Sequence, residues 1–130
     1  MVFVHMPPFG TDPDDQSFTT ASLPYPVRKG FLDTCAVGGV NVIACGHVHH
    51  YRRQQYRGME IVCAPGTAFV RNEPRHIVER GVQRSGYLSW TLNGKESFHE
   101  LIEPELFINH DMSNWGPSTT KLPPRALLMD

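Results

Sequence analysis

The clearest pattern in the chain is a largely apolar run at residues 40–45, preceded by two glycines and followed by Gly46 and three histidines. Such a run predicts a strand that is buried on both faces, as is typical of a parallel sheet. A shorter run of β-branched and aromatic residues at 2–4 predicts another strand, which ends at His5 because two prolines follow closely. A buried-type strand so near residue 1 suggests that the chain enters its sheet partway.

A helix is predicted between these two strands. Pro26 suits its first position, and Gly38 and Gly39 accept the left-handed conformation that ends many helices. Helical spacing places four residues on its expected buried face: Val27, Phe31, Leu32 and Cys35. Strand, helix and strand then form a right-handed crossover unit, in which the carboxyl ends of both strands meet at one edge of the sheet.

The second half of the chain predicts two antiparallel hairpins. Residues 51–57 meet 59–63 across Gly58, and residues 86–92 meet 95–102 across Asn93-Gly94. Leu88, Trp90 and Leu92 alternate onto one face of the second hairpin. The predicted fold class is therefore α/β, with a βαβ unit followed by antiparallel hairpins.

Two stretches lack such periodicity. Residues 71–85 are charged and irregular, which predicts a mobile surface loop, and residues 111–130 read as a loose tail that contains several prolines. The expected division is thus a domain over 1–110 followed by a tail over 111–130.

Composition narrows the class of protein. The chain has 130 residues, of which 40% are hydrophobic and 19% charged, as expected for one soluble domain. A net charge of −1 argues against generic binding to nucleic acid or acidic membranes. No run is long enough to span a membrane, and the first residues lack the pattern of a signal peptide. Three cysteines in apolar contexts predict buried thiols in a reducing compartment, and hence a cytoplasmic location.

The histidines after the buried strand are the candidate chemistry. Ligand sites of open α/β sheets lie past the carboxyl ends of the strands, where His47 and His49 stand one residue apart. An extended backbone would turn both rings to the same side, and His5 emerges at the same edge. Neutral imidazole suits Zn, Fe, Mn or Ni. The alternative is that these are ordinary loop histidines whose rings are hydrogen-bonded.

Aspartates in the loop after His5 are weaker candidates for metal ligands. Asp12, Asp14 and Asp15 stand among proline, serine and threonine, a composition that favours solvated turn residues.

The order of these elements resembles the C-terminal half of calcineurin-like metallophosphoesterases. The resemblance rests on the run from Val2 to Pro8 with its His5-Met6-Pro7, and on the strand that ends in Gly46-His47-Val48-His49. Ala64-Pro65-Gly66-Thr67 and the strand after Gly86 look like the branch of cyclic-nucleotide phosphodiesterase-like and purple-acid-phosphatase-like enzymes. The resemblance implies an α/β/β/α sandwich with two metal ions. It also implies that His5 and His47 bind the second ion and His49 the first.

The rest of the family pattern does not occur in this sequence. The family supplies an Asp-x-His, a Gly-Asp-x-x-Asp and a Gly-Asn-His-Glu ahead of the elements seen here, and none of the three is present. A bridging carboxylate holds two such ions together against their mutual repulsion, and three imidazoles offer no negative charge. We therefore expect a truncated phosphoesterase half that is inactive or very weak alone.

The sequence supports two functional interpretations. The first is a metal-dependent hydrolase of small phosphomonoesters or phosphodiesters. The second is a non-catalytic module that binds one metal ion, or that pairs through its sheet edge with a partner or second copy. His50 could face the substrate or cover the site. Arg52 and Arg53 could contact a substrate phosphate, although an exposed strand face is the simpler interpretation of both arginines.

Overall fold

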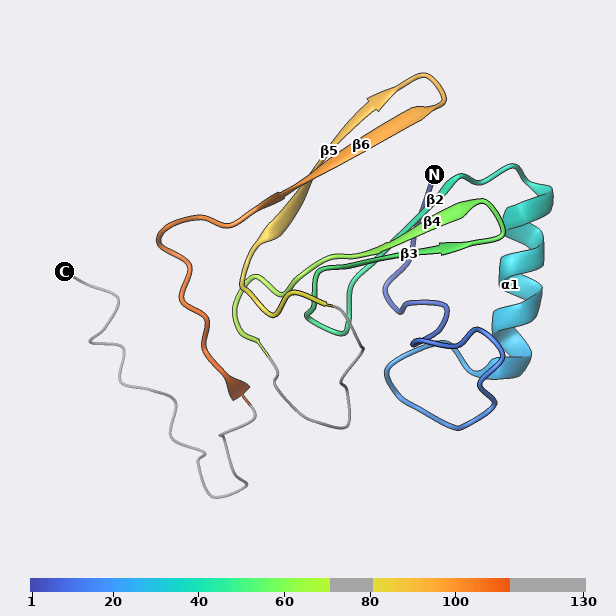
Figure 1. Cartoon of the computed structure of the whole chain (residues 1–130), viewed down its shortest axis with the longest axis horizontal. Coiled ribbons are helices and arrows are strands. Elements are labelled where there is room, and N and C mark those ends of the chain that lie inside the picture. The colour runs from blue at the N-terminus through green and yellow to red at the C-terminus, as the bar shows by residue number, and fades with distance from the viewer. Residues whose placement is uncertain (71–80, 113–130) are drawn as a thin grey trace.

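The computed structural model of the chain describes residues 1–70 and 81–112. Within these ranges it contains one helix and two sheets, which confirms the mixed α/β class (Figure 1). The elements in chain order are β1 (Val2–Phe3), α1 (Tyr25–Val37), β2 (Val42–Cys45), β3 (Arg52–Tyr56), β4 (Met59–Cys63), β5 (Tyr87–Asn93) and β6 (Glu96–Ile102). Residues 71–80 of the loop predicted over 71–85, and residues 113–130 of the tail predicted over 111–130, lie outside the described residues.

The larger sheet has the strand order β1-β2-β4-β3. β1 and β2 are parallel neighbours, with Val2 opposite Ile43, so the predicted parallel pairing of the two strands joined through α1 is confirmed. All four residues of β2 are buried, as the continuous apolar run predicted. β4 pairs in parallel with the other side of β2 and antiparallel with β3, so the first hairpin joins the sheet through its second strand.

The core lies between this sheet and α1. Alternate residues of β2 and β4 point toward the helix, because side chains along a strand alternate between its two faces. The buried cluster consists of Phe9, Leu32, Cys35, Ile43, Cys45, Met59, Ile61 and Cys63. All three cysteines are thus buried and free, as their apolar contexts predicted.

The buried face of α1 differs from the predicted one. Val27 is 57% exposed, whereas Arg28 is only 2% exposed and lies on the same stripe as Leu32 and Cys35. Arg28 Nη1 donates to the carbonyl oxygens of Pro13 and Asp15, and its Nη2 donates to that of Leu23. These bonds satisfy both terminal nitrogens of the buried guanidinium and fold the preceding loop onto the helix, whereas Nε has no partner among the described residues.

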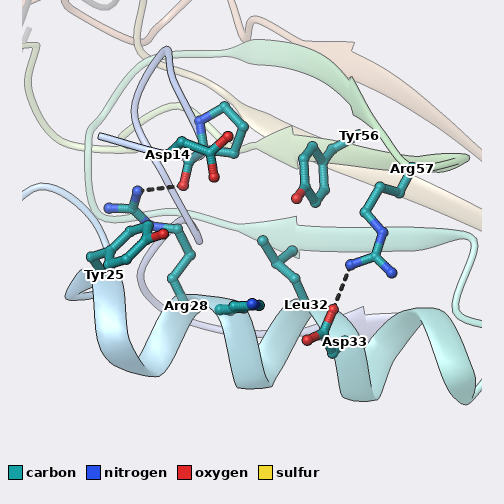
Figure 2. A pocket seen from close by; sticks show the side chains of 9 residues that line it. Asp14, Tyr25, Arg28, Leu32, Asp33, Tyr56 and Arg57 are labelled. Atoms are coloured by element: carbon teal, nitrogen blue, oxygen red, sulfur yellow. Dashed lines mark hydrogen bonds and ion pairs between the residues drawn. The ribbon is translucent and has the colours of Figure 1, made fainter. Parts of the chain in front are cut away.

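A second contact joins α1 to the turn between β3 and β4. Figure 2 shows Asp33 on the helix facing Arg57 at that turn, and the two form an ion pair beside the ring of Tyr56. Burial of Leu32 on the same side of the helix supplies the apolar part of this contact. The helix is therefore held at both ends, by the loop at its start and by the hairpin turn near its finish.

Both predicted hairpins are present. The turn of the first has positive φ at Arg57 and Gly58, the pattern of a type I′ turn. In the second, Asn93 pairs with Glu96, so the two-residue loop is Gly94-Lys95, one residue later than predicted. Of those two residues only Gly94 has positive φ, as in a type II′ turn.

The second hairpin forms a separate two-stranded sheet that extends away from the larger one (Figure 1). Trp90 contacts Phe3 of β1 edge-to-face, with ring centroids 6.1 Å apart. Leu92, predicted to share the face of Trp90, is exposed near the hairpin tip. No helix among the described residues is long and apolar enough to cross a membrane.

Candidate functional site

Two histidines from distant parts of the chain meet at the carboxyl edge of the sheet. His5 follows β1 and His47 follows β2, and the parallel pairing of these strands brings their ends together. Nε2 of His5 lies 3.0 Å from Nδ1 of His47. The backbone holds them in place, because Gly46 N–H donates to the carbonyl oxygen of His5 at 3.0 Å. The geometry thus agrees with the expectation that the two rings share one edge.

The other nitrogen of His47 determines which tautomer the ring adopts. Nε2 of His47 lies 2.7 Å from the carbonyl oxygen of Thr20. Because a carbonyl oxygen only accepts hydrogen bonds, Nε2 carries the proton and donates it, and Nδ1 of the neutral ring keeps a lone pair. Histidines that bind metal ions commonly donate their other N–H to a backbone carbonyl in this way.

The spacing of the two rings fits two states of the site. Two nitrogens of a tetrahedral ion, each at about 2.1 Å, lie about 3.4 Å apart, and those at adjacent positions of an octahedral ion lie about 3.0 Å apart. A hydrogen bond from Nε2–H of His5 to Nδ1 of His47 gives the same separation. His5 and His47 can therefore act as neighbouring ligands of one ion, and can hydrogen-bond to each other without it.

His49 occupies a different environment. Its Nδ1 lies 3.3 Å from the carbonyl oxygen of Phe69, and its ring packs against the Phe69 ring with centroids 4.2 Å apart. Gly66 lies so close that a β-carbon built on it would be 2.6 Å from Nδ1 of His49. Donation from Nδ1 to Phe69 would leave Nε2 as the nitrogen with the lone pair.

The backbone around these residues is not extended, in contrast to the expectation for residues 47–49. His47 has φ 69° and His49 has φ 56°, both in the left-handed region. This region is unfavourable for a residue with a β-carbon, by about 1–2 kcal/mol. Such outliers cluster at functional sites, and the two here flank Val48 in the candidate site.

The predicted ligands do not all converge in this conformation. Within residues 1–70 and 81–112, no three His, Cys, Asp or Glu side chains lie close enough together to hold a metal ion. The aspartates of the loop after His5 serve as turn residues, as favoured from the sequence. Asp12 accepts from the N–H of Asp14, and Asp15 accepts from Ser17, a bond that lowers the pKa of the Asp15 carboxyl.

The three candidate substrate contacts differ in exposure. His50 is buried, and Gly81 lies against its ring. Arg52 is also buried, at 2% exposure, and its guanidinium bonds the carbonyl oxygens of Phe9 and Gly10, so its side chain does not lie on an exposed strand face. Arg53 is exposed and pairs with Glu60, as expected for a surface strand position.

Three elements of this site were not predicted from the sequence. The carbonyl oxygens of Thr20 and Phe69 orient the two histidine rings, and Gly66 makes room for His49. Backbone acceptors carry no side-chain signature, so only the fold reveals them. Gly66 did have a signal, since a glycine in a turn after a buried strand often marks a close approach of side chain and backbone.

Neither a protein-family model nor a characterised protein matches this chain. The functional assignment therefore depends on the residues at the sheet edge and on their geometry.

Proposed function

We propose that the chain provides the histidine ligands of a metal-dependent phosphoester hydrolase, with His5, His47 and His49 binding the metal. The observation that carries the proposal is the contact of 3.0 Å between Nε2 of His5 and Nδ1 of His47 at the carboxyl edge of two parallel strands. The same order of elements gives the chain its resemblance to calcineurin-like phosphoesterases, whose fold would place a second sheet against this one.

The residues present suit a borderline metal such as Zn, Mn, Fe or Ni. His47 offers Nδ1 and is fixed by the carbonyl oxygen of Thr20; His49 offers Nε2 and is fixed by that of Phe69. A bound ion would supply a water of lowered pKa and a positive charge to polarise the ester. Convergence of His49 on the other two rings requires a change of its loop.

The other candidate residues would act on the substrate or support the site. Arg53, exposed on β3, can approach a phosphate if it releases Glu60. Arg52 is bonded to backbone oxygens, so its role would be to hold the loop after His5 near the sheet. His50 lies buried under Gly81 and would support the histidine loop from behind.

Metal binding by the full chain tests the first part of the proposal. Dialysis against zinc or manganese followed by elemental analysis should find one ion per chain. His5→Ala and His47→Ala should each weaken binding by more than about 100-fold. His110→Ala is the matched control, because this histidine is exposed and joins Val70 and Ile108 through backbone hydrogen bonds, which the substitution leaves in place. Equal binding by all three variants would refute the ligand assignment.

Hydrolysis of p-nitrophenyl phosphate and of its bis-ester tests the second part. We expect the chain alone to turn over far more slowly than an ordinary enzyme, whose rate is about 10 per second, because no carboxylate of residues 1–70 and 81–112 joins these histidines to bridge a metal pair. A rate near that value, abolished by His47→Ala, would mean that a second copy or the aspartates of the loop complete the site.

The second candidate function is a module that is completed by a partner. One observation favours it: β1 ends the described sheet order and pairs only with β2 there. An edge strand of this kind can accept a further strand from another chain. Metal binding without detectable hydrolysis, together with hydrolysis gained on mixing with such a partner, would distinguish this function from the first.

A further inference from the structure

The last residues of β2 and β4 bring two thiols together in the core. Cys45 and Cys63 are register partners on neighbouring parallel strands, and their Sγ atoms lie 3.0 Å apart. Both are buried and neither is in a disulfide. The third cysteine, Cys35, lies in α1 and provides an internal reference for experiments on the pair.

A buried cation lies beside this pair. Nη2 of Arg52 is 3.7 Å from Sγ of Cys63, and its other bonds go to the carbonyl oxygens of Phe9 and Gly10. No ion pair within the described part of the chain gives Arg52 a carboxylate partner. Arginine stays charged when buried, and an uncompensated buried charge is costly. Cys63 is therefore the adjacent group that can carry the compensating negative charge.

The electrostatics of the two sulfurs differ accordingly. A hydrogen bond with Cys45 lowers the pKa of Cys63 to about 7, and the charge of Arg52 lowers it further against the opposing effect of burial. Because Arg52 lies beside Cys63, Cys63 is the sulfur that is stabilised as a thiolate, and Cys45 is the second thiol, 3.0 Å away.

We propose that Cys45 and Cys63 form an oxidation site, at which a peroxide converts the two thiols into an intrachain disulfide. The Cys63 sulfur attacks one peroxide oxygen, the O–O bond breaks, and a sulfenic acid and one water result after proton uptake. Sγ of Cys45 then attacks that sulfur, displaces a second water and gives up its proton. Two thiols and one hydrogen peroxide thus become one disulfide and two waters.

The backbone permits this bond. Neighbouring strands lie about 4.8 Å apart, which is within the range of Cα separations that disulfides span. The sulfurs must approach by about 1 Å to reach the S–S distance of about 2.0 Å. Each cysteine ends its strand, so the adjoining loops can absorb that movement. The bond would tie the strand leading into His47 to the strand leading toward Gly66, and its formation does not depend on a metal.

Hydrogen peroxide applied to the reduced, folded chain tests the proposal. Free thiols are then alkylated in denaturant, and the tryptic peptides are identified by mass. Native chain should yield the peptides 30–52 and 58–71 joined by a reducible bond, since they carry Cys45 and Cys63. Because peptide 30–52 also carries Cys35, the Cys35→Ser variant must give the same product. In urea, the shorter loop should shift the product toward a Cys35–Cys45 bond within one peptide.

Two single variants assign the attacking sulfur. Trapping of the sulfenic acid should label Cys63 in Cys45→Ser and leave Cys45 unlabelled in Cys63→Ser, with folding of both verified by circular dichroism. The proposal is overturned if folded Cys35→Ser retains both thiols under conditions that oxidise it in urea. It is equally overturned if Cys63 proceeds to sulfinic acid without a disulfide, or if only cross-links between chains form.

Discussion

Gly66 lies directly against His49: a β-carbon on Gly66 would approach Nδ1 of the imidazole to 2.6 Å and the carbonyl oxygen of Phe69 to 2.7 Å. Gly66→Ala should therefore displace the ring and destabilise the fold by about 1–3 kcal/mol, with weaker zinc binding as a second effect. Urea unfolding measures the change in stability, and zinc titration measures the change in zinc affinity. Gly46→Ala is the control, since the nearest atom to its added carbon is 4.0 Å away. Equal behaviour of both variants would show that the His49 ring tolerates the displacement.

Arg28 fixes the loop that carries Thr20, and through Thr20 it supports His47. Arg28→Met keeps much of the side chain's volume but leaves three carbonyl acceptors unpaired, at a cost of about 2–4 kcal/mol. Zinc affinity should also fall, because His47 loses its oriented acceptor. Lys29→Met, at the exposed neighbouring position, should leave both the stability and the zinc affinity unchanged. If Arg28→Met lowers the stability but leaves the zinc affinity unchanged, Arg28 does not support His47.

Two glycines of the helix region should respond to alanine with opposite signs. Gly39 has φ 66°, so Gly39→Ala should cost about 1–2 kcal/mol. Gly30 lies inside α1 with open space around it, so Gly30→Ala should stabilise the protein by about 0.5–1 kcal/mol. Thermal unfolding of the two variants beside the parent measures both effects, and a shared sign would contradict a helix that ends before Gly39.

The lowered pKa of Cys63 predicts how stability varies with pH. Between about 7 and the usual cysteine value of 9, the folded state binds fewer protons than the unfolded state, so the free energy of unfolding should rise with pH. The gain is about 3 kcal/mol above pH 9, and it is lost as pH falls from 9 through 7. Above 9 the raised pKa of Cys45 should reverse the trend.

Urea unfolding under reducing conditions across this range tests the prediction. The rise between pH 7 and 9 should vanish in Cys63→Ser and persist in Cys35→Ser. If the free energy of unfolding still rises between pH 7 and 9 in Cys63→Ser, another titrating group causes the rise.

Local patterns predicted much of the fold. The apolar run before Gly46 predicted β2, and Gly58 predicted the turn of the first hairpin, because each signal depends on residues close in sequence. The parallel pairing of β2 with β4 depends on tertiary packing, which no short segment encodes. Arg28 replaced Val27 on the buried face for a similar reason: its acceptors are carbonyl oxygens of a distant loop.

The site shows the same division. The edge where His5 and His47 meet was predictable from the order of strand, helix and strand, and the structure places their nitrogens in contact. The left-handed backbone of His47 and His49 could not be predicted, because histidine has only a weak preference for that region. The Cys45–Cys63 contact depends on the register between strands, which becomes visible only in the sheet.

The strand order makes the two halves of the histidine site unequal in rigidity. β2 is flanked by strands on both sides, whereas β1 has two residues and a single neighbour within the described sheet. Opening of the His5 segment therefore breaks few backbone bonds, among them Val4 N–H to Ala44 and Gly46 N–H to His5. Under the proposed function, His47 would be the preorganised ligand and His5 the adaptable one. Binding of an ion should therefore slow amide hydrogen exchange along residues 2–5 more than it slows exchange in β2.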